Sequence, residues 1–493
     1  FRVHNPATGA LLAEVPETSR DALASMVVRA RAAQSGWAAL PFRDRARALK
    51  RLVRRMRDDP ELLDTLTAES GKPRYEAELF ELFYTLELTR YYTSRHGKRA
   101  LVDQVRRQFL FPNKRARIIQ HPRGVVSVIG PWNWPLLNNF ADAIAPLLAG
   151  NAVILKPSEW TPLTSLRIEK LWRAEGLPEA LFQVAIGASE VGRALVDSAD
   201  MVFFTGSERA GREIAKAAAE RMVPVILELG GKSAMIVLAD ADLPRAARAA
   251  IWSGFAHSGQ VCIRTERVFV EEAIADRFNA ACVAELKKLR QGPSADPDVF
   301  DIGAMTFPPQ MDRLDQQIAD ALTRGAKLLH GGARAKDRIG NYFTPTLLAD
   351  ATTEMRVMTE ETFGPVLPIM RVKSAEHALR LTNESRLGLS GSIWSRDSAR
   401  ANALARRIES GSVCVNDVLF NYLAVEAPLG GIKHSGLGVR HGAEALRQFC
   451  WTESVLEDAP LLGRFSDLVA RLLGFPYDRR TLAIARWAMK RLY

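Results

Sequence analysis

The hydrophobic pattern of the chain changes near residue 124. Residues 19–99 place apolar side chains at helical spacing, and turn signals at Pro41, Pro60 and Gly71-Lys72-Pro73 separate successive amphipathic helices. From 124 onward, short apolar runs alternate with longer amphipathic segments. This alternation predicts parallel strands joined by helices, the doubly wound α/β architecture typical of nucleotide-binding proteins.

The sequence predicts two series of strands and helices of this kind. In the first, we expect strands at 125–129, 152–155, 182–185, 201–204 and 223–227, with helices at 136–148, 163–175 and 209–221. In the second, we expect strands at 234–238, 267–270, 366–372, 391–394 and 413–415, with helices at 244–257, 275–289, 375–382 and 399–409. Residues 101–119 alternate weakly, which predicts a projecting β-ribbon.

Length and charge narrow the class of protein. A chain of 493 residues exceeds a single core and predicts two or three domains. It contains no run of 18 apolar residues, so we expect no transmembrane helix. The net charge of +11 lies largely in Arg-rich helical segments such as 43–57, where acidic residues are interleaved. Solvated helix faces explain this charge better than nucleic acid, because no nucleic-acid-binding fingerprint accompanies it.

The cysteines indicate free thiols. The chain has four of them, at Cys262, Cys282, Cys414 and Cys450. None forms a C-x-x-C pair or a Cys/His cluster with zinc spacing, so no metal site is predicted. Their scarcity fits a reducing compartment, and we expect a cytoplasmic protein.

Two short motifs supply a thiol and a carboxylate, which a single reaction could use together. Glu228 lies in Leu-Glu-Leu-Gly-Gly-Lys-Ser (227–233), and Cys262 lies in Phe-Ala-His-Ser-Gly-Gln-Val-Cys-Ile-Arg (255–264). A cysteine attacks a carbonyl, and a carboxylate activates the water that releases the product. Most lone buried cysteines are only small apolar side chains, so the case depends on the surrounding motifs.

Further motifs follow predicted strands, at the edge of a doubly wound sheet where ligands bind. The usual G-x-G-x-x-G fingerprint is missing after the first strand, and Gly206 to Gly211 is followed by Arg-Glu, which argues against a nucleoside triphosphatase. Thr205-Gly206-Ser207 instead offers backbone N–H groups at a helix start to a pyrophosphate. Lys156 and Glu159 follow another strand and are expected to hold ribose hydroxyls, with an ordinary surface loop as the alternative.

Asn133 stands in the stiff segment Pro-Trp-Asn-Trp-Pro (131–135). Its side-chain amide offers N–H donors to an oxyanion, and a structural corner is the alternative. Together with Lys-Pro-Ser-Glu, Phe-Thr-Gly-Ser, Glu-Leu-Gly-Gly-Lys, Gly-Gln-x-Cys and Glu-x-Phe-Gly-Pro, in this order, the segment resembles the aldehyde dehydrogenase superfamily from Asn5 to about Asp458.

The resemblance implies an α/β fold with two doubly wound α/β domains plus a small β oligomerisation ribbon. The implied domains are an NAD-binding domain (1–102 and 124–230), the ribbon (103–123 and 445–456), a catalytic domain (231–444) and a C-terminal helical tail (457–493). The implied assembly is a homodimer or homotetramer.

The resemblance also assigns roles to individual residues. Cys262 is the implied nucleophile, Asn133 and the Cys262 backbone N–H hold the oxyanion, and Glu228 activates water for thioester hydrolysis. The implied cofactor contacts are Lys156 and Glu159 at the adenosine ribose, Trp132 and Ser207 at the pyrophosphate, and Gly230, Glu361 and Phe363 at the nicotinamide end. Relatives that form acyl-CoA typically lack the carboxylate at Glu228, so the expected product is a free acid.

The cofactor expected is NAD, because a carboxylate at Glu159 accepts from a 2′-hydroxyl and repels a 2′-phosphate. The substrate pocket is expected to contain Asn138, Ala141, Val261, Ile263 and Phe420. Because the predicted lining lacks an arginine, we expect an apolar aliphatic or aromatic aldehyde. The alternative is an NADP-preferring semialdehyde dehydrogenase.

Two features depart from the family pattern. Asp142 and Arg440 stand where most relatives carry the opposite charges, which predicts a reversed ion pair; two independent solvent-facing changes are the alternative. The tail places Leu461, Leu462, Phe465, Leu468, Val469 and Leu472 on one helical face, followed by a basic segment at 479–493. Packing on the same protomer or a dimer partner is the first expectation, and peripheral membrane contact is the second.

Overall fold

The computed structural model describes residues 1–293, 300–459 and 463–492. Leu461 and Leu462, which belong to the predicted apolar face of the tail, lie outside the described residues. The contacts divide the chain into two compact units: residues 1–100 with 122–449, and residues 101–121 with 450–493. Each unit is described by itself below.

The first unit begins with a small strand pair and then a series of helices. Strands β1 (Arg2–His4) and β2 (Leu11–Glu14) are antiparallel. The helices that follow are α1 (Arg20–Ala39), α2 (Phe42–Arg57), α3 (Pro60–Ser70), α4 (Arg74–Glu76), the π-helical segment η1 (Ala77–Phe83), α5 (Tyr84–Tyr92) and α6 (Arg95–Leu101). The prediction of successive helices over 19–99 is therefore confirmed.

Helix α2 shows what the Arg-rich segment does. Its apolar face, which includes Leu49, Leu52 and Met56, is fully buried, while most of its arginines remain exposed. Arg51 and Arg55 both pair with Glu175, at 2.8 and 2.7 Å. The positive charge of this segment thus covers a solvated helix face, as the pattern predicted.

The first large sheet has, among the described residues, six strands in the order β19-β9-β8-β5-β6-β7. They are β5 (Val125–Ile129), β6 (Ala152–Lys156), β7 (Phe182–Val184), β8 (Met201–Thr205), β9 (Val225–Glu228) and β19 (Gly436–Leu437). Strands β5 to β9 are parallel and β19 is antiparallel. The connecting helices are the π-helical segment η2 (Leu136–Phe140), α7 (Ala141–Ala149), α8 (Leu163–Ala174), α9 (Ser189–Ser198) and α10 (Glu208–Glu220). All five strands of the first predicted series are confirmed.

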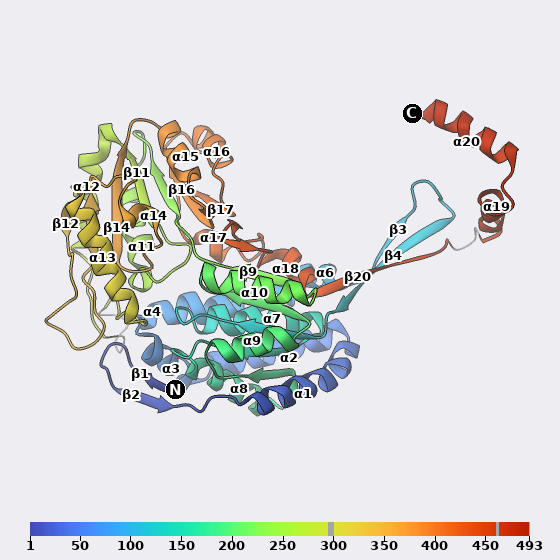
Figure 1. The fold of residues 1–493 in the computed structure, drawn as a ribbon, viewed down its shortest axis with the longest axis horizontal. Coiled ribbons are helices and arrows are strands. Elements are labelled where there is room, and N and C mark those ends of the chain that lie inside the picture. Colours follow the sequence, from blue (N-terminus) through green and yellow to red (C-terminus); the bar gives the residue numbers. More distant parts are fainter. Residues whose placement is uncertain (294–299, 460–462, 493) are drawn as a thin grey trace. The chain divides into compact units, whose positions relative to one another are not determined.

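The second large sheet has seven described strands in the order β12-β13-β14-β11-β10-β16-β17 (Figure 1). They are β10 (Ala234–Val237), β11 (Arg267–Glu271), β12 (Lys327–His330), β13 (Thr346–Ala349), β14 (Val366–Val372), β16 (Ser390–Trp394) and β17 (Ser412–Val415). Its helices are α11 (Leu243–Phe255), α12 (Ala275–Leu286), α13 (Pro309–Thr323), α14 (Arg356–Thr359), α15 (Ala375–Asn383) and α16 (Ser398–Ala405). The predicted strands are confirmed, and the structure adds β12, β13, α13 and α14.

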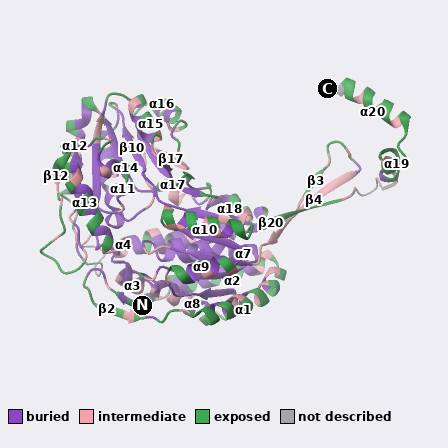
Figure 2. Ribbon diagram, in the orientation of Figure 1, coloured by how far each residue is buried: buried purple, intermediate pink, exposed green. Residues whose placement is uncertain are grey.

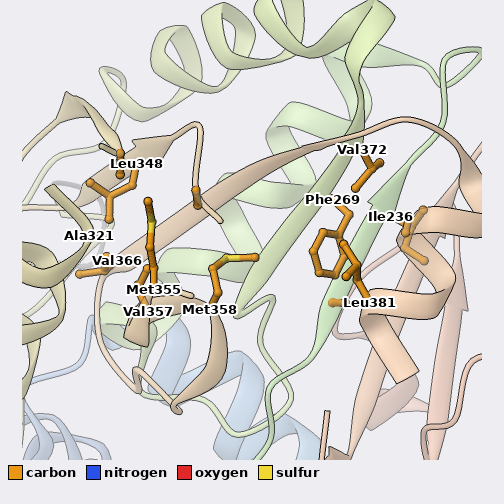
Figure 3. Close-up of a cluster of buried hydrophobic side chains, with 14 of the residues drawn as sticks. Ile236, Phe269, Ala321, Leu348, Met355, Val357, Met358, Val366, Val372 and Leu381 are labelled. Carbon is orange, nitrogen blue, oxygen red and sulfur yellow. The ribbon is translucent and has the colours of Figure 1, made fainter. Parts of the chain in front are cut away.

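Apolar packing holds each sheet between its helices. In Figure 2 the central strands are buried, while the outer faces of the surrounding helices are exposed. Figure 3 shows one such cluster, in which Ile236 and Phe269 from neighbouring strands lie with Leu381 of α15. Continuous apolar runs are what strands need when helices cover both faces of a sheet, which is why the sequence pattern located them.

The second unit contains a three-stranded sheet and two helices. Strands β3 (Gln104–Arg107), β4 (Lys114–Pro122) and β20 (Cys450–Asp458) lie in the order β20-β4-β3. Helices α19 (Gly463–Leu473) and α20 (Arg479–Leu492) follow. The predicted strands within 101–119 are confirmed. None of the described helices combines the length and the apolarity needed to cross a membrane.

Candidate active site

Cys262 follows a strained turn at the end of α11. The turn η4 (Ala256–Gly259) carries three consecutive positive φ angles, 46° at His257, 54° at Ser258 and 72° at Gly259. A Cβ at Gly259 would lie 2.2 Å from the Gly364 carbonyl oxygen, so only glycine fits there. The His257 N–H donates to both carboxylate oxygens of Glu76, at 2.9 and 3.0 Å. Such strain persists only where surrounding contacts hold it, and here it fixes the position of Cys262.

Asn133 is held beside this turn. Its side-chain amide donates to the Gln260 carbonyl at 2.9 Å, and its own carbonyl accepts from Lys72 Nζ at 2.9 Å. Lys72 is completely buried, pairs with Glu81 and lies 3.7 Å from the centre of the Trp134 ring. Glu81 in turn accepts from the backbone N–H groups of Leu136 and Leu137, at 2.8 and 3.0 Å. The buried pair therefore fixes the start of η2 and, with it, the backbone of Asn133.

Glu228 ends β9 and is buried. Burial raises the pKa of its carboxyl to about 7; the Arg440 guanidinium lowers that pKa and the Asp142 carboxylate raises it. Its Oε1 lies 3.8 Å from Arg440 Nε and has no hydrogen-bond partner among the described residues. A carboxyl group with a pKa near neutrality is suited to exchange a proton at physiological pH.

The predicted reversed ion pair is present. Arg440 Nη1 lies 3.6 Å from Asp142 Oδ1, and both side chains are buried. Burial raises the pKa of Asp142 to about 6, and Arg440 opposes this shift. The alternative of two independent solvent-facing residues is excluded for this structure.

An apolar cavity has the thiol of Cys262 in its lining. It is lined by Phe80, Trp134, Leu137, Asn138, Trp252, Ala256, Val261, Cys262, Ile263, Leu419, Tyr422 and Leu423. None of these described residues carries a charge. Burial raises the pKa of the Cys262 thiol to about 12, and the Glu228 carboxylate raises it further while Arg440 lowers it. The thiol therefore has to lose its proton before it attacks.

Three of the five predicted pocket residues line this cavity: Asn138, Val261 and Ile263. Ala141 does not, because it is buried within the first residues of α7. Phe420 does not either: it is 52% exposed, and its ring lies 5.9 Å from that of Trp252. Sequence reasoning missed Phe80, which comes from η1, far from the motifs in sequence, and Trp252, which lies in α11 just before the cysteine motif; Trp134 stood inside a quoted motif.

The predicted cofactor residues surround the carboxyl ends of β6, β8 and β9. Ser207 caps α10, its hydroxyl accepting from the Ala210 N–H at 3.3 Å. Lys156 donates to the carbonyls of Pro157 and Gly187, at 3.0 and 2.7 Å. The Trp132 ring stacks on Phe307 at 5.4 Å and meets Phe363 edge-on at 5.5 Å. Glu159 is half-buried and its charge raises the pKa of Lys156, although burial lowers that pKa more.

The nicotinamide-end residues lie together. Glu361 accepts from the Gly231 N–H at 2.9 Å, and a Cβ at Gly230 would lie 2.5 Å from Glu361 Oε2. Burial raises the pKa of Glu361 to about 7, and the Glu266 carboxylate adds to that rise. This arrangement fits a dinucleotide: the backbone is bare beside a half-buried carboxylate, aromatic rings lie nearby, and a helix N-terminus follows the strand ends. Within the described ranges, no cluster of three or more His, Cys, Asp or Glu side chains is placed to hold a metal ion.

Comparison with known proteins identifies the family. The model of the aldehyde dehydrogenase family matches residues 1–455. A Methylomonas protein named 4,4'-diapolycopene aldehyde oxidase is 40% identical over 455 residues, covering 92% of this chain and 84% of the relative. A Mycolicibacterium smegmatis protein, provisionally named a succinate-semialdehyde dehydrogenase [NADP(+)], is 36% identical, covering 91% and 87%.

Solved structures agree. Betaine aldehyde dehydrogenase from Staphylococcus aureus in complex with NAD+ superposes with a TM-score of 0.87 at 29% identity, covering 93% of this chain and 92% of that one. An E. coli NADP-dependent enzyme gives a TM-score of 0.88 at 32% identity, covering 93% and 94%. The chain belongs to the aldehyde dehydrogenase family. It is an NAD(P)-dependent aldehyde dehydrogenase.

Proposed function

We propose that the protein oxidises an apolar aliphatic or aromatic aldehyde to the carboxylic acid with NAD. The observation that carries this proposal is the cavity itself, whose described lining is uncharged and includes Cys262. A charged substrate would lose its hydration there without gaining a partner.

The proposed reaction begins when the Cys262 sulfur bonds to the aldehyde carbon after the thiol has lost its proton. That proton passes to solvent water, and Arg440 assists its loss because the guanidinium charge lowers the pKa of the thiol. The carbonyl oxygen becomes an oxyanion, which receives hydrogen bonds from the Asn133 amide and the Cys262 backbone N–H. Removing one such donor typically costs about 3–4 kcal/mol of barrier stabilisation.

A bound NAD supplies the acceptor for the hydride that leaves the substrate carbon, so that a thioester remains on Cys262. Glu228 then takes a proton from water, and the resulting hydroxide bonds to the thioester carbon. The carbon–sulfur bond breaks, the acid leaves and Cys262 is free again. Trp132, Lys156, Glu159, Ser207, Gly230, Glu361 and Phe363 are the residues proposed to hold the cofactor.

The substrate class has one competing hypothesis. The Methylomonas relative is named for 4,4'-diapolycopene aldehyde, whereas the Mycolicibacterium relative is named for succinate semialdehyde and NADP(+). A carboxylate-bearing semialdehyde needs a cation, and none of the described lining residues supplies one. A higher kcat/KM for hexanal or benzaldehyde than for succinate semialdehyde supports the apolar assignment, and the reverse order overturns it.

The NAD preference rests on Glu159 and Lys156. The Lys156 ammonium is already bonded to two backbone carbonyls, and the charges of both Glu159 and Glu17 act on it. A 2′-phosphate would therefore meet more negative than available positive charge at this end of the site. Steady-state rates with each cofactor test this, and a kcat/KM for NADP equal to that for NAD contradicts it.

The second unit is proposed to mediate assembly into a homodimer or homotetramer. Its strands expose Trp451, Val455 and Leu456, and its helices expose apolar side chains at Phe465, Leu468, Leu472, Leu482, Ile484 and Trp487. Exposed apolar patches of this kind usually mark an interaction surface. Light scattering of the full chain and of a chain ending at residue 458 tests the assembly. Co-sedimentation with anionic liposomes by the full chain alone would instead assign the tail to a membrane surface.

A further inference from the structure

The buried guanidinium of Arg440 lies between Glu228 and two residues that line the substrate cavity. Arg440 Nη1 donates to Asn138 Oδ1 at 2.8 Å and to the Tyr422 hydroxyl at 2.6 Å, and Asn138 and Tyr422 both line the cavity. Arg440 Nη2 donates to the Thr205 hydroxyl at 2.9 Å, at the end of β8. Two carboxylates lie beyond hydrogen-bond distance: Asp142 Oδ1 is 3.6 Å from Nη1, and Glu228 Oε1 is 3.8 Å from Nε.

Two buried carboxylates thus share one cation. Arg440 Nε, Glu228 Oε1 and Asp142 Oδ2 have no hydrogen-bond partner among the described residues. Burying a carboxylate costs free energy unless a positive charge compensates it, and one guanidinium cannot fully compensate two. The ionisation of Glu228 therefore depends on how strongly Arg440 faces it and on the charge of Asp142.

We propose that Arg440 is a positioning residue for the deacylating base: its charge favours the ionised form of Glu228, and its hydrogen bonds to Asn138, Tyr422 and Thr205 hold the guanidinium beside that carboxylate. Asp142 is proposed to oppose it, by competing for the same guanidinium. This inference rests on the proposed role of Glu228 and adds the residues that control it.

The charges of the groups around Arg440 and Glu228 decide whether a substitution raises or lowers the pKa of Glu228. Near Glu228 these are Asp142, Arg440 and the Cys262 thiol; around the guanidinium they are Tyr84, Tyr92, Tyr422 and His441. The tyrosines have raised pKa values and His441 a strongly lowered one, so all four are neutral near pH 7. Loss of Arg440 should therefore raise the pKa of Glu228, and loss of the Asp142 charge should lower it.

A p-nitrophenyl ester tests this without cofactor. Its burst of p-nitrophenolate reports attack by Cys262, and its steady rate reports hydrolysis of the acyl-enzyme. Arg440→Met is expected to move the pH midpoint of hydrolysis upward by about one unit and to slow hydrolysis at pH 7 about fivefold. Asp142→Asn is expected to move the midpoint downward, and Arg440→Lys to restore it close to the wild-type value.

The control is Arg43→Met in α2, whose side chain is 80% exposed, so that one positive charge is lost outside the buried centre; this variant is expected to keep the midpoint. A wild-type midpoint in folded Arg440→Met overturns the proposal. If that variant does not fold, Asp142→Asn decides, and an unchanged midpoint there overturns it equally. Cys262→Ala tests the proposed function separately from the inference about Arg440. A burst that survives in this variant refutes Cys262 as the nucleophile.

Discussion

Gly230→Ala tests whether the backbone beside Glu361 must stay bare for the cofactor to bind. A Cβ at this position would lie 2.5, 2.7 and 2.8 Å from Oε2, Oε1 and Cδ of Glu361, closer than the 3.0 Å that real Cβ atoms keep. The Glu361 side chain must therefore move, and its 2.9 Å hydrogen bond from the Gly231 N–H breaks. Because the end of this side chain is flexible, the fold should survive the substitution.

The expected loss of NAD affinity follows from the proposed hydrogen bond between the Glu361 carboxylate and the cofactor, which the displaced side chain would no longer make. A hydrogen bond to a charged group contributes about 1.5–3 kcal/mol, so the dissociation constant of NAD should rise about tenfold to a hundredfold. Isothermal titration with NAD measures this directly. The matched control is Gly36→Ala, since a Cβ there meets nothing within 4 Å inside α1. Wild-type NAD affinity in folded Gly230→Ala would refute the assignment of Gly230 and Glu361.

Two further predictions concern the base and the buried pair. The pKa of Glu228 is raised to about 7, so its ionised form accumulates as the pH rises through 7. The rate of acyl-enzyme hydrolysis should rise over the same pH interval. A rate that stays flat from about pH 5.5 to 8.5 contradicts the role of Glu228 as the base. Lys72→Met leaves Glu81 buried without its cation and should cost about 3–5 kcal/mol of stability, while the double variant with Glu81→Leu recovers part of that loss. Urea denaturation measures both variants, and a wild-type midpoint for Lys72→Met is incompatible with the buried pair.

The fold was predictable where burial is continuous. The strands of both large sheets are apolar runs because helices cover both faces, and that pattern is visible in the sequence. Strand β12 was missed because it is a short antiparallel edge strand with exposed residues at Lys327 and Leu328, so it carries no such run. Strand β13, although buried, has only four residues and follows Pro345, so its pattern is too short to separate from a loop.

The candidate site was predictable where a motif carries it. Cys262, Glu228 and Asn133 come from short quoted segments, and the structure brings Asn133 to the turn that precedes the thiol. The supporting contacts were not predictable, because they join residues far apart in sequence. Lys72 donates to the Asn133 carbonyl from 61 residues away in sequence. The positive φ at His257 is also not predictable, because only a few per cent of non-glycine residues adopt it. Sequence indicated the charge reversal at Arg440 but not the hydrogen bonds that link it to the cavity wall.

Trapping the acyl-enzyme tests the central claim most directly. Glu228→Gln, mixed with hexanal and NAD, should release a single burst of NADH and accumulate a hexanoyl thioester, which peptide mass spectrometry can locate. The account predicts the acyl group on Cys262 and none on Cys282, Cys414 or Cys450, which are buried. An acyl group on another cysteine, or full steady-state turnover by Glu228→Gln with no acyl-enzyme, would contradict it.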